Sequence, residues 1–164
     1  MMIAPDRVNE LKSTEKPIVR ATVIAKAPRA QGSPGGSLPV EVEFILSALE
    51  AGASTSAGPA DRRRGERMKY HVCASLKLYS EPEAGLPWQI FVRDVNPKGL
   101  GFLTRHRLPL GYGGILTVVS PQGGVAKIDC TLVRCREAVP GWFEGSMYFN
   151  REQGAFAVTS DTNA

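Results

Sequence analysis

The sequence predicts a mainly β fold, a small six-stranded antiparallel barrel preceded by one short amphipathic helix. Two observations lead to this prediction. From about residue 70 onward, apolar side chains recur at every second position, which is the period of a strand with one buried face. Turn signals such as NPKG, GYGG and PQGG then separate short apolar runs at close spacing, as in small all-β barrels.

The composition is that of one globular domain with appendages. The chain has 164 residues, 43% of them hydrophobic and 22% charged, which argues against disorder over the whole length. No apolar run reaches the roughly 18 to 20 residues that cross a bilayer, and the amino terminus lacks the apolar centre of a secretory signal. We therefore expect a cytoplasmic protein without a membrane span. Cys73, Cys130 and Cys135 form no metal-binding pattern and are predicted to be buried, reduced thiols.

Shifts in composition divide the chain into five segments. Turn-rich and charged stretches predict flexible tails at both ends, and a run of Ala, Gly, Ser, Thr and Pro predicts a linker between the helix and the barrel. The expected segments are a flexible N-terminal tail (1–36), the helix (37–52), the linker (53–60), the barrel domain (61–157) and a C-terminal tail (158–164).

The helix is predicted by an apolar stripe at helical spacing, made of Val42, Ile45, Leu46 and Leu49. Ser37 can cap its start, Pro39 suits its first turn, and Gly52 is expected to end it. A helix of about four turns is marginal in water on its own, so this stripe should dock on another surface, for which the barrel is a candidate.

The first strand is predicted by the alternation of Val72, Ala74, Leu76 and Leu78 with more polar neighbours. Further strands are expected over 88–94, 99–104, 115–120, 126–137 and 142–149. In the long fifth strand the apolar alternation slips between Leu132 and Cys135, which predicts a β-bulge at a corner of the barrel.

The residues do not favour catalysis. His71 and His106 show no spacing to a nucleophile, a carboxylate pair or metal ligands, so we expect neither an enzyme nor a bound cofactor. The GLG at 99–101 lacks a third glycine and a following helix, and is interpreted as a turn and a tight strand start. Trp88 and Trp142 are expected to cover a barrel end, the alternative being a platform on which a base stacks.

The strongest binding signal combines an arginine run with a polar turn. The run DRRRGER at 61–67 concentrates positive charge in a chain of net charge +4, which favours an anionic partner. In DVNPKG at 94–99, Asp94 and Asn96 lie two apart and share a face of an extended strand, and Gly99 is expected to take a positive φ in the turn. Guanidinium groups bind phosphate bidentately and stack on bases, while Asp94 can accept from the N–H groups of guanine.

In this combination the chain resembles the PilZ domain family, whose hallmark is an RxxxR arm followed by a D/NxSxxG turn. Here these are Arg63-Arg-Gly-Glu-Arg67 and Asp94-Val-Asn-Pro-Lys-Gly99, about 27 residues apart, followed by GLGF and the terminal strand WFEGSMYF. The resemblance covers roughly residues 61–150. It implies a six-stranded antiparallel barrel that binds the bacterial second messenger cyclic di-GMP.

The resemblance further implies a noncatalytic receptor in which the ligand closes the arginine arm onto the barrel and alters a surface seen by a protein partner. The ligand-binding residues it implies are Arg62, Arg63, Arg67, Asp94, Asn96 and Gly99. An arginine at the place of Arg62 accompanies an intercalated pair of ligands in relatives, and Asn96 stands where the family has Ser. The alternatives are a degenerate PilZ domain acting as a protein interaction adaptor and, less favoured, a small barrel that binds nucleic acid.

Overall fold

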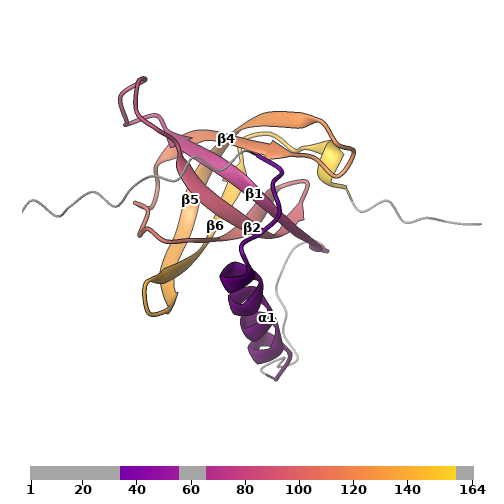
Figure 1. The fold of residues 1–164 in the computed structure, drawn as a ribbon. Helices are drawn as coiled ribbons and strands as arrows, with labels where there is room; N and C mark the ends of the chain where they lie inside the picture. The colour runs from indigo at the N-terminus through magenta and orange to yellow at the C-terminus, as the bar shows by residue number, and fades with distance from the viewer. Residues whose placement is uncertain (1–33, 56–65, 158–164) are drawn as a thin grey trace, which may run out of the picture.

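The structure, a computed structural model, describes residues 34–55 and 66–157 (Figure 1). Residues 1–33 of the predicted N-terminal tail, 56–60 of the predicted linker and the predicted C-terminal tail lie outside the described residues. Among the described residues, no helix has the length and apolar character needed to cross a membrane.

Six antiparallel strands form one sheet that closes into a ring (Figure 1). The strands are β1 (Met68–Leu78), β2 (Trp88–Asn96), β3 (Gly99–Thr104), β4 (Gly113–Val119), β5 (Val125–Val139) and β6 (Trp142–Phe149). Their order around the ring is β1-β2-β3-β6-β5-β4, and β1 closes it by pairing with both β2 and β4. The predicted mainly β fold of six antiparallel strands is confirmed.

The inside of the ring is an apolar core built from alternate side chains of the strands. Leu76, Ile90, Phe102 and Leu116 are among its fully buried members. After β6, a single 3-10 turn, η1 (Gly154–Phe156), adds the buried ring of Phe156, which lies 5.8 Å from Phe149 and 6.3 Å from Tyr70 between ring centroids.

One helix, α1 (Val40–Thr55), lies outside the ring (Figure 1). It begins later than predicted: the carbonyl of Pro39 accepts the amide hydrogen bonds of Val42 and Glu43, so Ser37 lies before the helix and does not cap it. The predicted end at Gly52 is also wrong, because the helix continues to Thr55. A glycine inside a helix costs only about 1 kcal/mol relative to alanine, which a docked helix can tolerate.

The predicted apolar stripe of α1 packs against the outer face of the ring. Val42, Ile45 and Leu46 are buried there, and their cluster includes Cys73, Phe91, Leu103 and Trp142 from the strands. The expectation that the stripe must dock is confirmed, and the barrel is the surface that receives it. Cys73 on the outward face of β1 is consequently buried, so β1 is covered on both sides at this point.

All three cysteines are buried free thiols, as predicted. Burial raises the pKa of each, to about 12 for Cys130. Protonated thiols are poor nucleophiles, so these residues have a packing role.

Of the four register shifts in the sheet, two place charged side chains of the candidate site on the outer face. The bulge predicted in β5 is confirmed by a register shift against β6 between Leu132 and Arg134. A second shift, which the sequence analysis did not predict, interrupts the pairing of β2 with β3 between Val92 and Asp94. As a result, two consecutive side chains, those of Arg93 and Asp94, both lie outside the core.

Candidate functional site

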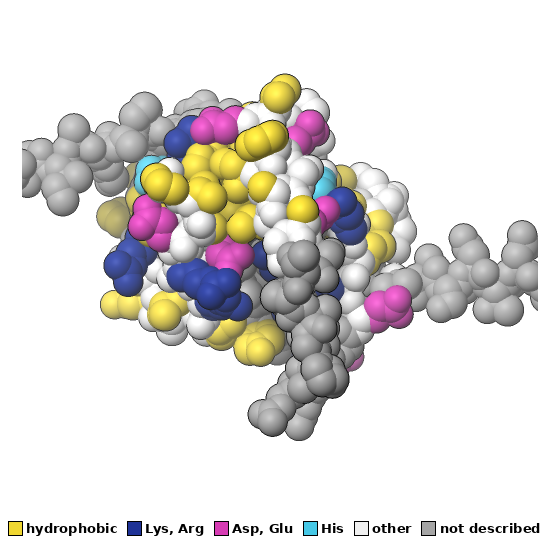
Figure 2. Space-filling model, turned by 90° about the horizontal axis from the view of Figure 1, so that it is seen from below, with side chains coloured by type: hydrophobic (Ala, Val, Ile, Leu, Met, Phe, Trp, Pro, Cys, Tyr) yellow, Lys and Arg dark blue, Asp and Glu magenta, His cyan; other side chains and the backbone are white. Residues whose placement is uncertain are grey.

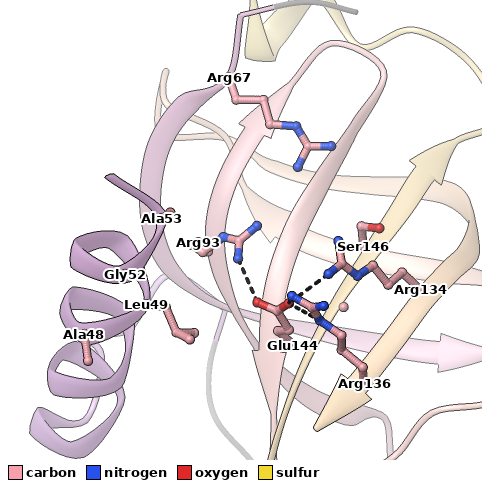
Figure 3. Close-up of a pocket in the computed structure, with 11 residues that line it drawn as sticks. Ala48, Leu49, Gly52, Ala53, Arg67, Arg93, Arg134, Arg136, Glu144 and Ser146 are labelled. Carbon is pink, nitrogen blue, oxygen red and sulfur yellow. Dashed lines mark hydrogen bonds and ion pairs between the residues drawn. The ribbon is translucent and has the colours of Figure 1, made fainter. Parts of the chain in front are cut away.

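A cleft of about 430 Å³ lies where the second half of α1 meets the outer face of the ring (Figure 3). We call it the arginine cleft. The helix side consists of Ala48, Leu49, Gly52 and Ala53, and the remaining lining consists of Arg67, Arg93, Arg134, Arg136, Glu144, Gly145 and Ser146. Its volume falls within the range of roughly 300 to 1,000 Å³ that is typical of small-molecule sites.

Glu144 on β6 is the centre of the charges in the arginine cleft (Figure 3). Its Oε2 accepts a hydrogen bond from Arg93 Nη1 at 3.2 Å, and its Oε1 accepts from Arg134 Nη2 at 3.1 Å and from Arg136 Nε at 2.5 Å. The residue is only 8% exposed, so three guanidinium groups from two strands converge on one buried anion.

Asp94 continues this charge network toward the start of β1. Its Oδ1 accepts from Arg67 Nη1 at 2.7 Å, and its Oδ2 accepts from Arg93 Nε at 2.6 Å. Burial alone would raise the pKa of Asp94, but Arg93 and Arg67 outweigh it and hold the pKa below its ordinary value of 3.8. Gly101 on β3 leaves the space for this contact, since a Cβ there would lie 2.9 Å from Arg93 Nη2 and 3.0 Å from Asp94 Oδ1.

The turn after β2 is shaped by Asn96. Its Oδ1 accepts hydrogen bonds from the backbone N–H groups of Lys98 and Gly99, both at 2.9 Å, so this oxygen is committed to the turn. Gly99 does not have the positive φ that we predicted. It is required for a different reason: a Cβ at this position would collide with the carbonyl oxygen of Met147 on the neighbouring strand.

The structure brings together part of the predicted ligand-binding set. Arg67 and Asp94 are in direct contact although 27 residues separate them, and Asn96 and Gly99 form the adjoining turn. Asp94 and Asn96 share the outer face as predicted, because Val95 between them is fully buried in the core. Arg62 and Arg63 lie outside the described residues.

Four charged residues of the arginine cleft were not predicted from the sequence: Arg93, Arg134, Arg136 and Glu144. A signal for two of them was present, because the bulge predicted in β5 shifts the alternation so that Arg134 and Arg136 both face outward while Cys135 between them is buried. The bulge in β2 left no such signal, and the position of Glu144 opposite Arg136 depends on the pairing of β5 with β6.

The second half of α1 is fixed beside the cleft by Glu50. This carboxylate accepts from Lys69 Nζ at 2.6 Å and lies 3.3 Å from His71 Nε2, both on β1. A smaller hollow of about 300 Å³ is lined by Glu50, Lys69 and Asp94, and it shares the remaining lining residues Leu49, Ala53, Arg67 and Arg93 with the arginine cleft.

The two tryptophans lie away from this lining. Trp142 is buried beneath α1, with the guanidinium carbon of Arg105 4.1 Å from its ring centroid, so it offers no platform for a base. Trp88 donates to Glu81 Oε1 at 2.8 Å and its ring lies 4.8 Å from that of His106.

Comparisons of the chain with protein-family models, with curated proteins and with solved structures find no match. Within residues 34–55 and 66–157, no group of three or more His, Cys, Asp or Glu side chains is placed to hold a metal ion.

Proposed function

We propose that the protein is a noncatalytic receptor for cyclic di-GMP, with its ring of strands acting as a PilZ-like barrel. The observation that carries this proposal is the contact between Arg67 and Asp94 at 2.7 Å. It joins the last arginine of the RxxxR motif to the first residue of the DxNxxG turn, at the edge of a cleft of ligand size. In this proposal Arg63 and Arg67 hold phosphate and guanine, and Asp94 accepts from a guanine edge.

The charge of the site also supports an anionic ligand. Four arginines line the cleft, against Glu144 within it and Asp94 beside it, which leaves an excess of two positive charges. On the face viewed from the α1 end, Lys and Arg side chains gather beside acidic ones (Figure 2). A cyclic dinucleotide carries two phosphodiester charges, so one molecule would neutralise this excess.

One observation favours the second candidate, a degenerate PilZ domain that serves as a protein interaction adaptor. Both oxygens of Asp94 already accept from arginines, and the Asn96 carbonyl oxygen is used by its own turn. A guanine edge would have to share or displace these hydrogen bonds, and displacing them would reduce the affinity for the ligand.

Isothermal titration calorimetry of the full chain with cyclic di-GMP tests the proposal. We expect binding of two ligand molecules per chain, with Arg62 supporting the second. Cyclic di-AMP should bind more weakly, because adenine lacks the ring N–H and the 2-amino group of guanine, from which Asp94 would accept hydrogen bonds. Arg63→Ala and Arg67→Ala should each reduce affinity by about ten- to a hundredfold, since each removes a charge-assisted contact worth roughly 1.5 to 3 kcal/mol. Absence of binding to the unmodified chain would favour the adaptor instead.

A further inference from the structure

Arg134 and Arg136 stand at the end of the arginine cleft that contains none of the motif residues (Figure 3). They lie on β5, directly after the bulge, and pair in register with Ser146 and Glu144 of β6. Without the bulge, Arg134 and Arg136 would point into the ring and Cys135 outward. The bulge therefore places both arginines on the outer face of the ring.

Glu144 orients these arginines without neutralising them. One carboxylate accepts from three guanidinium groups, of which Arg93 is also paired with Asp94, so Arg134 and Arg136 keep one positive charge in excess of Glu144. The side chain of Glu144 is 10% exposed, whereas those of Arg134 and Arg136 are 50% and 64% exposed. Each guanidinium has five N–H donors, so donors beyond those used by Glu144 remain available to an anion in the cleft.

The facing wall of the cleft leaves room for such an anion. Helix α1 contributes Ala48, Gly52 and Ala53 beside Leu49, and a Cβ added at Gly52 would meet no atom of the described residues within 4 Å. A larger residue at these positions would fill the space between the helix and the arginines. The small helix residues thus leave space beside the arginines of the cleft.

We infer that Arg134 and Arg136, positioned by Glu144, form a phosphate-binding subsite of the ligand site, apart from the Arg63 and Arg67 motif. The identity of the phosphate compound as cyclic di-GMP rests on the proposed function. The guanidinium pair takes one phosphodiester, while Arg67 lies at the other end of the same cleft, where it pairs with Asp94 of the adjoining hollow. Arg93, which contacts both Asp94 and Glu144, joins the two ends electrostatically.

The test compares Arg134→Gln, Arg136→Gln and the double variant with Arg105→Gln in the full chain. Arg105 is a matched control, because its side chain is 50% exposed like that of Arg134 and it also pairs with a carboxylate, Glu41 at 2.8 Å. It lies outside the cleft lining. Thermal unfolding verifies that each variant is folded before titration.

Two probes are titrated by calorimetry, cyclic di-GMP and inorganic pyrophosphate. We expect the double variant to weaken cyclic di-GMP binding by at least about tenfold and to abolish pyrophosphate binding, as the loss of charge-assisted hydrogen bonds implies. Arg105→Gln should change either affinity by less than about twofold, since an exposed ion pair contributes little.

The outcomes separate this inference from the proposed function. Cyclic di-GMP binding that is equal in the unmodified chain and the double variant overturns the subsite and leaves the receptor proposal standing. Pyrophosphate binding that depends on Arg134 and Arg136, without cyclic di-GMP binding, supports the subsite and overturns the receptor. If the unmodified chain binds neither probe, both are wrong.

Discussion

At the scale of single residues, Asp94 is the point at which two arginines from separate parts of the chain meet one carboxylate. Arg67 precedes β1 and Arg93 belongs to β2, so the carboxylate ties the start of the first strand to the second. A half-buried carboxylate with two guanidinium partners stabilises the fold through these ion pairs only in its ionised form.

We therefore expect a pH-dependent contribution of Asp94 to stability. Its pKa in the folded state lies below the ordinary value of 3.8, so the contribution is fully present well above pH 3.8 and is lost as the pH falls through the folded-state pKa. Urea unfolding of the unmodified chain and Asp94→Asn between pH 7 and pH 2.5 measures this. The gap in unfolding free energy should narrow below pH 3.8, and a constant gap would contradict the ion-pair account.

Gly99 and Gly52 should respond in opposite directions to substitution by alanine. In Gly99→Ala the new methyl group would collide with the Met147 carbonyl oxygen of the neighbouring strand, so we expect a loss of about 1 to 3 kcal/mol in unfolding free energy. Gly52→Ala enters open space inside a helix and should raise stability by about 0.5 to 1 kcal/mol. Denaturant titration of both variants checks this, and a destabilised Gly52→Ala would contradict a helix that continues to Thr55.

At the scale of elements, α1 is attached to the ring by a single apolar stripe and a few polar contacts. We expect Leu46→Ala, which empties a fully buried site of that stripe, to loosen α1 more than the ring. Such a truncation typically costs about 2 to 5 kcal/mol, and here the loss falls on an element that can detach locally. Amide hydrogen exchange should show lost protection over 40–55 with little change in the strands.

Leu116→Ala is the matched control for that experiment. Leu116 is equally buried but lies inside the ring, so its truncation should lower protection throughout the strands. Equal loss in α1 and the strands for Leu46→Ala would mean that the helix and the ring unfold as one unit.

The elements also show what the sequence could predict. Alternation and turn residues located all six strands, and the slipped alternation around Leu132 located the bulge in β5, because both signals are local. The ends of α1 were wrong by a few residues, because the carbonyl of Pro39 accepts the first helical hydrogen bonds and because a single glycine such as Gly52 does not by itself end a helix. The charge cluster around Glu144 was beyond prediction, because it depends on which strand lies beside β5 and on the second bulge at Arg93.

At the scale of the whole molecule, every strand of the closed ring pairs with a neighbour on each side over at least part of its length. This limits the backbone groups that are open to pairing with another chain. The arginine cleft instead offers side chains, where the outer face of the ring meets α1.

Docking of α1 has one more consequence, which concerns the segment 56–65 that carries Arg62 and Arg63. Its two ends are both anchored, by the packing of α1 on one side and by the pairing of Arg67 with Asp94 on the other. The segment therefore joins two anchored ends, and the entropy cost of closing such a loop rises with its length. Because the ends are held together with or without a ligand, lengthening the segment should weaken the docking of α1 rather than ligand binding.

We expect that inserting about ten Gly and Ser residues between Ala57 and Gly58, which roughly doubles the segment, weakens the docking of α1 by about 0.6 kcal/mol, because doubling a loop costs about that much closure entropy. Amide hydrogen exchange over 40–55, for insertions of increasing length, measures the trend, with an insertion of the same length between Gly123 and Gly124, in the turn that joins β4 to β5, as the control. Protection of α1 that stays constant as the segment grows would show that the docking of α1 does not depend on closing this loop.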